Sequence, residues 1–366
     1  MGFMFSRLGR YVIARVAWGI VIALFAVLAS ILLIDLVEQM RTVGTRAELS
    51  LWEALRLTLL KTPMLIEQTL PFVVLAGSMM AIIGLNRSSE LVAMRAAGVS
   101  AWRFLAPAAL TGIVIGLFTI TILNPIGAHL FKSFEEERSD ALSDRNRGEA
   151  DAGVWIRQGD REGQVVIHAD TVDASGSTLQ GATFMFFAES DNALRFERRI
   201  LAERAELRPG FWQLTNLVEA TPGGRPVRHT HLAIPTTLDA TEMIDRFVSP
   251  ASLSFWALPG FIGEARAAGF APTRYELKWQ SLLAYPLLLS TMAALGAAFS
   301  LQLQRLGNMA RWGAGGVGVG LFLFFYSQLA GAFALTQTVP AVVAAWSAPF
   351  AGMFIAFAMV AFLEDG

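Results

Sequence analysis

The chain of 366 residues contains no cysteine and very few lysines. Without cysteine it has no disulfide framework, no thiolate metal site and no cysteine nucleophile. Its three lysines are Lys61, Lys132 and Lys278, and none of them follows a glycine, as the lysine of a phosphate-binding P-loop must. The serine-hydrolase motif G-x-S-x-G and the zinc motif H-E-x-x-H are also missing from the sequence. The sequence therefore excludes a P-loop ATPase and gives no sign of a hydrolytic active site.

Charge is scarce and unevenly placed along the chain. Charged residues make up 16% of the sequence and hydrophobic residues 54%, whereas soluble domains carry about 25% charged residues. The net charge of -1 excludes a nucleic-acid-binding protein that relies on overall positive charge. Residues 126–274 hold 16 of the 29 Lys and Arg and 21 of the 30 Asp and Glu. We therefore divide the chain into an apolar block (1–125), a polar block (126–274) and a second apolar block (275–366).

Six apolar runs, three on each side of the polar block, match the length of about 20 residues that a helix needs to cross a membrane. The runs are Val16–Ile34, Leu70–Leu85 (extended to Met64 if Glu67 is allowed), Phe104–Ile126, Trp279–Leu303, Gly313–Thr336 and Pro340–Leu363. The first run is longer than the apolar core of a signal peptide and lacks a clear cleavage site, which favours an uncleaved anchor. In the fifth run, Gly316 and Gly320 are four residues apart, a spacing that favours close helix packing. The sequence predicts a membrane α-helical fold with six transmembrane helices arranged three plus three.

Basic residues near the membrane helices predict the orientation of the chain. If the N-terminus is cytoplasmic, eight arginines lie inside and three lie in the short outside loops. The inside arginines are Arg7, Arg10, Arg15, Arg87, Arg95, Arg103, Arg305 and Arg311, and the outside ones are Arg41, Arg46 and Arg56. This imbalance favours cytoplasmic N- and C-termini, with residues 126–274 in the periplasm if the cell is Gram-negative.

The polar block has the pattern of a folded all-β domain. Short runs of strand composition, separated by turn residues, favour an antiparallel sandwich or roll. The expected strands are Val154–Arg157, Gln164–Val172, Ala182–Ala188, Leu194–Leu207, Phe211–Val218 and Val227–Ile234. His229 and His231 lie on one face of the last strand, where such a pair could bind a metal. With no third ligand in view, a solvent-exposed strand face explains them better, and we expect no metal site.

The segment between the second and third membrane helices, near residues 86–98, predicts a short cytoplasmic helix. Ser88 or Ser89 can cap its start, Glu90 falls in its first turn, and Gly98 can end it. Leu91 and Met94 recur at helical spacing on one face. Such a helix could dock into a groove on a soluble partner. The alternative is an interfacial helix on lipid, which the scarcity of lysines and aromatic residues makes less favourable.

Ionisable residues also gather at the outer ends of the first three membrane helices, where their burial would be costly. Among them Arg41, Lys61 and Lys132 form a cationic subset that could meet an anionic lipid head group. The alternative is ordinary anchoring of the helices at the membrane surface. Acidic neighbours, including Asp35 and Glu135, argue against a purely basic pocket.

The whole chain resembles the LptF/LptG family of lipopolysaccharide-export permeases. The most specific motif is Arg87-Ser88-Ser89-Glu90-Leu91-Val92-Ala93-Met94-Arg95-Ala96-Ala97-Gly98, together with the three-plus-three layout around one strand-rich insert. Two further segments are closer to LptG than to LptF. They are Ile34-Asp35-Leu36-Val37-Glu38-Gln39-Met40-Arg41, and Leu253-Ser254-Phe255-Trp256 together with Arg274-Tyr275-Glu276-Leu277.

The resemblance implies a permease subunit of an ABC transporter that extracts lipopolysaccharide from the inner membrane. Its partners would be an LptF-like sister permease, an LptB-like ATPase dimer that binds the ATP and Mg²⁺, and an LptC-like bridge protein that receives the lipid from periplasmic β-jellyrolls. The segment 86–98 would be the coupling helix, contacting the ATPase through Glu90, Arg87, Leu91 and Met94. Arg41 and Lys132 match positions linked to the lipid's phosphates, whereas Lys61 is a candidate from the charge pattern alone. Asp35 and Glu135 depart from basic residues of the family.

Two other function classes are alternatives to a permease subunit. A membrane-anchored assembly or sensor protein would bind a partner through its periplasmic β-domain and would tolerate changes in the cytoplasmic segment. A proton-driven secondary transporter fits less well, because such proteins place acids or broken helices near the membrane centre, whereas the ionisable groups here cluster at the helix ends.

Overall fold

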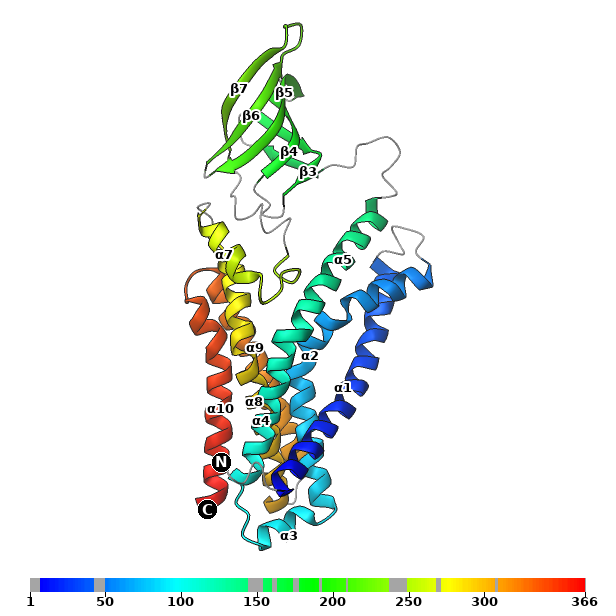
Figure 1. Cartoon of the computed structure of the whole chain (residues 1–366), viewed down its shortest axis with the longest axis vertical. Coiled ribbons are helices and arrows are strands. Elements are labelled where there is room, and N and C mark those ends of the chain that lie inside the picture. Colours follow the sequence, from blue (N-terminus) through cyan, green and yellow to red (C-terminus); the bar gives the residue numbers. More distant parts are fainter. Residues whose placement is uncertain are drawn as a thin grey trace. The chain divides into compact units, whose positions relative to one another are not determined.

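The structure is a computed structural model that describes residues 7–42, 50–143, 154–159, 163–173, 178–190, 193–208, 210–236, 249–267, 271–306 and 309–365. Within these ranges six helices are long and apolar enough to cross a membrane, and an antiparallel β-sheet is inserted between the third and the fourth (Figure 1). The predicted fold class is therefore confirmed. Arg46, which the orientation argument used, lies outside the described residues.

The helices extend beyond the apolar runs that predicted them. They are α1 (Arg7–Thr42), α2 (Leu51–Arg87), α3 (Glu90–Ala96), α4 (Trp102–Phe118), the π-helix η1 (Thr119–Leu123), α5 (Asn124–Ser143), α7 (Leu258–Ala267), α8 (Thr273–Leu306), α9 (Met309–Leu335) and α10 (Ala341–Asp365). The start of α2 is fixed by a capping box, in which Ser50 and Glu53 each bond the other's backbone N–H. The third candidate span combines α4, η1 and α5 and covers Trp102–Ser139.

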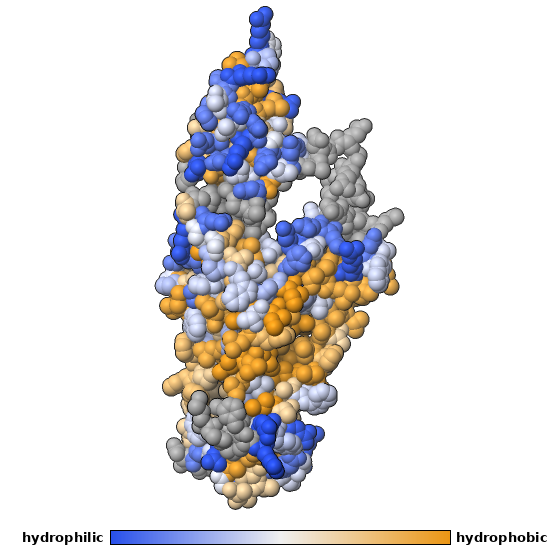
Figure 2. Space-filling view, in the orientation of Figure 1, coloured by the Kyte–Doolittle hydropathy of each residue, from blue (hydrophilic) through white to orange (hydrophobic). Residues whose placement is uncertain are grey.

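The chain divides into two compact units. The helical unit comprises residues 1–142, 251–258 and 273–366, and the β unit comprises residues 143–250 and 259–272. On the face of the helical unit drawn in Figure 2, apolar residues cover the middle of the helices and hydrophilic residues gather toward their ends. This distribution is typical of helices that span a bilayer.

Helix α8 lies at the centre of the helical unit. It packs against α2, α4, α9 and α10. Of its most apolar stretch of 18 residues 78% is buried, whereas the buried share of the corresponding stretch of α1 is 17%. The contact with α4 is close because Gly112 and Gly116 face the backbone of Leu289 and Pro286, where a Cβ at either glycine would overlap it. Small residues at such crossings let two helix backbones approach each other.

Two further helix contacts depend on glycine. Gly19 of α1 and Gly77 of α2 face each other so closely that a Cβ at Gly77 would overlap the backbone of Ile20. Gly316 and Gly320 of α9 lie against the side chains of Met79 and Leu75, both on α2. The predicted packing role of the glycine pair in the fifth membrane helix is therefore confirmed.

The β unit contains one antiparallel sheet, which curves in Figure 1. Its described strands are β1 (Val154–Gly159), β2 (Gly163–Ala169), β3 (Thr171–Val172), β4 (Thr178–Ser190), β5 (Ala193–Arg208), β6 (Phe211–Ala220) and β7 (Val227–Pro235). The order across the sheet is β1-β2-β4-β5-β6-β7, with β3 pairing only with β4. Each of the six predicted strands is present, although residues 164–172 are divided between β2 and β3.

Alternation along the strands builds the core of the β unit. In β6, Trp212 and Leu214 are buried whereas Phe211 and Gln213 are exposed, as the sequence pattern predicts. The ring of Trp212 meets the ring of Phe184 edge-on, with 5.8 Å between their centroids. Burying such rings stabilises the sheet on its inner face.

Candidate functional site

A sharp turn joins α2 to α3 and presents one acidic side chain. The chain leaves α2 at Arg87, Ser89 takes a left-handed conformation with φ +57°, and α3 begins at Glu90. Ser89 therefore occupies the cap position, but its side chain makes no capping hydrogen bond. The expectation of a serine cap is wrong in this respect, because the left-handed backbone of Ser89 differs from the extended conformation of a capping residue. The predicted end of the helix is confirmed, since Gly98 has φ +83° just beyond it.

Ser88 bonds to the side chain of Glu90 instead of capping the helix. Its hydroxyl lies 2.9 Å from Glu90 Oε1, and it also lies 3.2 Å from the carbonyl oxygen of Gly84. One carboxylate oxygen of Glu90 is therefore oriented by its own turn.

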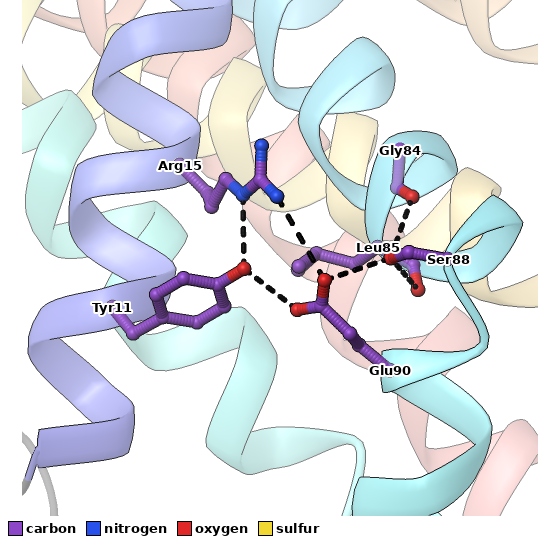
Figure 3. Close-up of polar contacts among 6 residues, drawn as sticks. All are labelled: Tyr11, Arg15, Gly84, Leu85, Ser88 and Glu90. Atoms are coloured by element: carbon purple, nitrogen blue, oxygen red, sulfur yellow. Dashed lines mark hydrogen bonds and ion pairs between the residues drawn. The ribbon is translucent and has the colours of Figure 1, made fainter.

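The other oxygen of Glu90 is held by α1, as Figure 3 shows. The hydroxyl of Tyr11 donates to Glu90 Oε2 at 2.6 Å, and Arg15 Nε donates to that same hydroxyl at 3.0 Å. A guanidinium nitrogen of Arg15 also lies 3.8 Å from Glu90 Oε1. The pKa of the Glu90 carboxyl lies below its ordinary value, mainly because Tyr11 donates to the carboxylate and also because Ser88 does. Glu90 is thus a fixed anion whose side chain remains 36% exposed.

The other residues predicted for this helix have different environments. Leu91 is fully buried and holds α3 against the rest of the helical unit. Met94 is half-buried, and Arg87 is exposed at the end of α2. A partner that approaches this corner could therefore meet Glu90, Arg87 and part of Met94, with Leu91 supporting them from inside.

The three residues predicted to meet a lipid head group have separate surroundings. Lys61 forms an ion pair with Asp35 at 2.6 Å, which joins α2 to α1, and its Nζ lies 5.9 Å from the centre of the Phe134 ring. Lys132 is 66% exposed on α5, with Glu136 of the same helix 4.0 Å away. Arg41 is exposed in the last turn of α1.

A second ion pair, which the sequence did not predict, joins three elements of the helical unit. Glu67 of α2 accepts hydrogen bonds from Lys278 of α8 at 2.6 Å and from Asn124 of α5 at 2.8 Å. Asn124 in turn accepts a hydrogen bond from the backbone N–H of Phe255 at 2.8 Å. The available signal was the single acid inside an otherwise apolar run, since an ionisable residue there needs a partner.

Comparison with known proteins gives the family of the chain. The family model described as "Lipopolysaccharide export system permease LptF/LptG" matches residues 10–361. The chain belongs to the LptF/LptG family. It is also 24% identical over 343 residues to the lipopolysaccharide export system permease protein LptG of Haemophilus influenzae, an alignment that covers 93% of this chain and 94% of that protein. The predicted resemblance to this family, and to LptG within it, is confirmed.

Family membership together with six apolar helices makes the chain a multi-pass protein of the inner membrane and a transport subunit. The motif that predicted the LptF/LptG family, Arg87 to Gly98, forms the turn and α3. Among the residues that the structure describes, no group of three or more His, Asp and Glu side chains could hold a metal ion. His229 lies instead 3.7 Å from Glu219 on the β-sheet.

Proposed function

We propose that this chain is the LptG-like permease subunit of an ABC transporter that extracts lipopolysaccharide from the inner membrane. It works with an LptF-like sister permease, and an LptB-like ATPase dimer binds the ATP and Mg²⁺ and supplies the energy. The lipid then passes to an LptC-like bridge protein. The proposal is supported by the family match and by the absence of a P-loop from the sequence.

The arrangement of Glu90 is the observation that carries the proposal. The carboxylate is partly exposed at a corner between two membrane-length helices, and its oxygens are already oriented by Tyr11 and Ser88. An oriented carboxylate at the start of a short helix suits contact with a cationic or hydrogen-bonding surface on a soluble partner. When the two ATPase subunits close, they would press on α3 and move the helices attached to it.

The orientation of the chain follows from this role. The turn at Glu90 faces the cytoplasm, as do both termini, and the β unit, within residues 126–274, lies in the periplasm and passes the lipid on. The imbalance of arginines between the two sides supports this orientation.

The head group of the lipid would bind near the outer ends of α1, α2 and α5 through Arg41, Lys61 and Lys132. Lys132 is the more open of the two lysines, whereas Lys61 is 25% exposed and paired with Asp35. A phosphate would therefore have to compete with Asp35 for Lys61, and it would meet Lys132 first.

A charge reversal at Glu90 tests the proposal. In cells that depend on this chain, Glu90→Arg should abolish lipopolysaccharide export, because it places a cation where the ATPase dimer meets an anion. The control is Glu264→Arg, which reverses an exposed acid on α7. Complex assembly is measured by co-purification of the ATPase in mild detergent. Normal growth with Glu90→Arg would refute the proposal, and a chain that never co-purifies with an ATPase would favour the anchored assembly or sensor protein.

A further inference from the structure

Two residues of α1, one helical turn apart, converge on the acid of α3. Tyr11 and Arg15 are separated by four positions, so both side chains lie on the same face of α1. The Tyr11 hydroxyl accepts a hydrogen bond from Arg15 and donates one to Glu90, 79 positions away in the sequence (Figure 3). Arg15 also lies over the Tyr11 ring, 5.6 Å from its centre. The tyrosine is therefore fixed on two sides, and it fixes Glu90.

The two contacts of Glu90 with α1 differ in strength. Its hydrogen bond with Tyr11 is short at 2.6 Å, whereas the guanidinium of Arg15 is 3.8 Å away and its side chain is 48% exposed. Exposed ion pairs at such a distance contribute little to stability, but short hydrogen bonds to a charged group are stronger. A cation on a partner can therefore displace Arg15 from Glu90 Oε1 while Tyr11 keeps its hold on Oε2.

Helix α1 is also joined to α2 at two other levels. Gly19 and Gly77 bring the two backbones into contact, and Asp35 and Lys61 form an ion pair nearer the far end of α1. Together with the contact between Tyr11 and Glu90, these attachments tie α1 to α2 and α3 at three levels along its length. A displacement of α3 that keeps the hydrogen bond between Tyr11 and Glu90 would therefore act on α1.

We infer that Tyr11 and Arg15 are positioning residues that orient Glu90 and make α1 move together with α3. The inference rests on the proposed function, because it assumes that Glu90 meets the ATPase. It assigns to α1 the role of the helix that receives the motion and carries it along its length to the level of Lys61. Neither residue needs to touch lipid or ATP for this role.

Coupling efficiency is the first test, made on the full complex of this chain, its sister permease and the ATPase dimer in nanodiscs with lipopolysaccharide. Tyr11→Phe and Arg15→Gln should lower the lipid released per ATP hydrolysed, Tyr11→Phe by about tenfold or more because it removes a hydrogen bond to a charged group. The controls are Tyr326→Phe on α9 and Arg10→Gln on α1, which remove the same groups from exposed positions. Co-purification of the ATPase should be unchanged in all four variants.

Movement of the helices is the second test, and this chain has no cysteine of its own that would compete with the engineered ones for a spin label. Spin labels placed at exposed Ala14 of α1 and Val92 of α3 report the distance between the two helices. The distance should stay constant between nucleotide-free and vanadate-trapped complexes, and it should change on trapping in the Tyr11→Phe variant. The same labels with Tyr326→Phe should behave like the unmodified chain.

The outcomes separate the inference from the proposed function. If Glu90→Gln leaves both export and ATPase binding normal, the proposed coupling role of Glu90 is refuted and the inference falls with it. If Glu90→Gln impairs export but Tyr11→Phe and Arg15→Gln match their controls, only the inference is overturned. Loss of ATPase co-purification in Tyr11→Phe would also overturn it, because the hydroxyl would then act on assembly and not on coupling.

Discussion

The ion pair between Asp35 and Lys61 is expected to be a strong tie between α1 and α2, and a double-mutant cycle measures it. The perturbations are Asp35→Asn, Lys61→Met and the double variant. Asp35 is 7% exposed and Lys61 is 25% exposed, with 2.6 Å between Oδ1 and Nζ. Removing one partner takes the ion pair from the other charge in a largely buried place. The two single changes together should therefore reduce stability by more than the double change does.

The magnitude follows from the burial of the pair. At 2.6 Å and an effective dielectric constant of about 20, the Coulomb attraction is about 6 kcal/mol. Desolvation of both ions offsets most of this, and the partial exposure of Lys61 weakens it further. We therefore expect a loss of about 3 kcal/mol for Lys61→Met and a coupling energy of about 2 kcal/mol.

The assay is unfolding in mixed micelles of dodecyl maltoside and SDS, followed by circular dichroism. The matched control is the pair Lys132 and Glu136, which is also a lysine with an acid but is exposed, with 4.0 Å between the charged atoms. The cycle of Lys132→Met and Glu136→Gln should give about 0.5 kcal/mol or less. A coupling energy for Asp35 and Lys61 no larger than that of the control pair would refute the reasoning.

Three other perturbations test separate parts of the structure. Gly77→Ala should destabilise the helical unit by about 2 kcal/mol in the same assay, because its Cβ meets the backbone of α1; Gly84→Ala, with nothing within 4 Å of the added carbon, should not. Lys278→Met should lower the free energy of unfolding by about 2 kcal/mol, because it takes a cation from Glu67, which is 14% exposed. Recovery of that stability by Glu67→Gln in the same chain would confirm the pair. Losses from the two changes that simply add would contradict it. The depressed pKa of Glu90 means that its bond with Tyr11 is fully present above the carboxyl's unfolded pKa of about 4.3 and is lost as the pH falls through the lower folded value. The protection of the α3 amides, measured as their exchange rate divided into the intrinsic rate at the same pH, should therefore fall on acidification, and at a higher pH in Tyr11→Phe. Identical protection profiles would contradict this.

Apolar composition predicted the existence of the membrane helices well and their ends poorly. The third apolar run stops at Ile126, but the helical segment that it predicted continues through η1 and α5 to Ser143. Residues such as Lys132, Glu136 and Glu137 are good helix formers, so helix continues where hydrophobicity ends. Hydrophobicity indicates which residues can lie in lipid, and it says nothing about where a helix stops once it leaves the bilayer.

The β unit was predicted from alternation, which reports the face of each residue directly. Trp212 and Leu214 are buried as their positions required. The order of strands across the sheet depends on pairing between distant segments, and local alternation carries no information about it.

For the candidate site too, the sequence indicated the central residue but not the residues that contact it. Glu90 could be singled out because the sequence around it has candidate helix-end residues, helical spacing of apolar residues and a charge in the first turn, all within a short segment. Its two partners on α1 could not, because the contact between Tyr11 and Glu90 spans 79 positions and depends on how α1 crosses α2. Likewise, the sequence placed Asp35 and Lys61 at the same end of two helices, but only the packing of those helices makes them a pair.

The central position of α8 has a consequence for how the protein is made. Helices α2 and α4 leave the ribosome before the strand-rich insert, whereas the helix that fills the space between them is synthesised after it. Until α8 has been synthesised, Gly112 and Gly116 of α4 lack the α8 backbone at Leu289 and Pro286 against which they pack. The first three membrane helices therefore cannot reach their final packing until the insert and α8 have been synthesised, and during that interval they expose surface that makes an incomplete chain prone to misassembly.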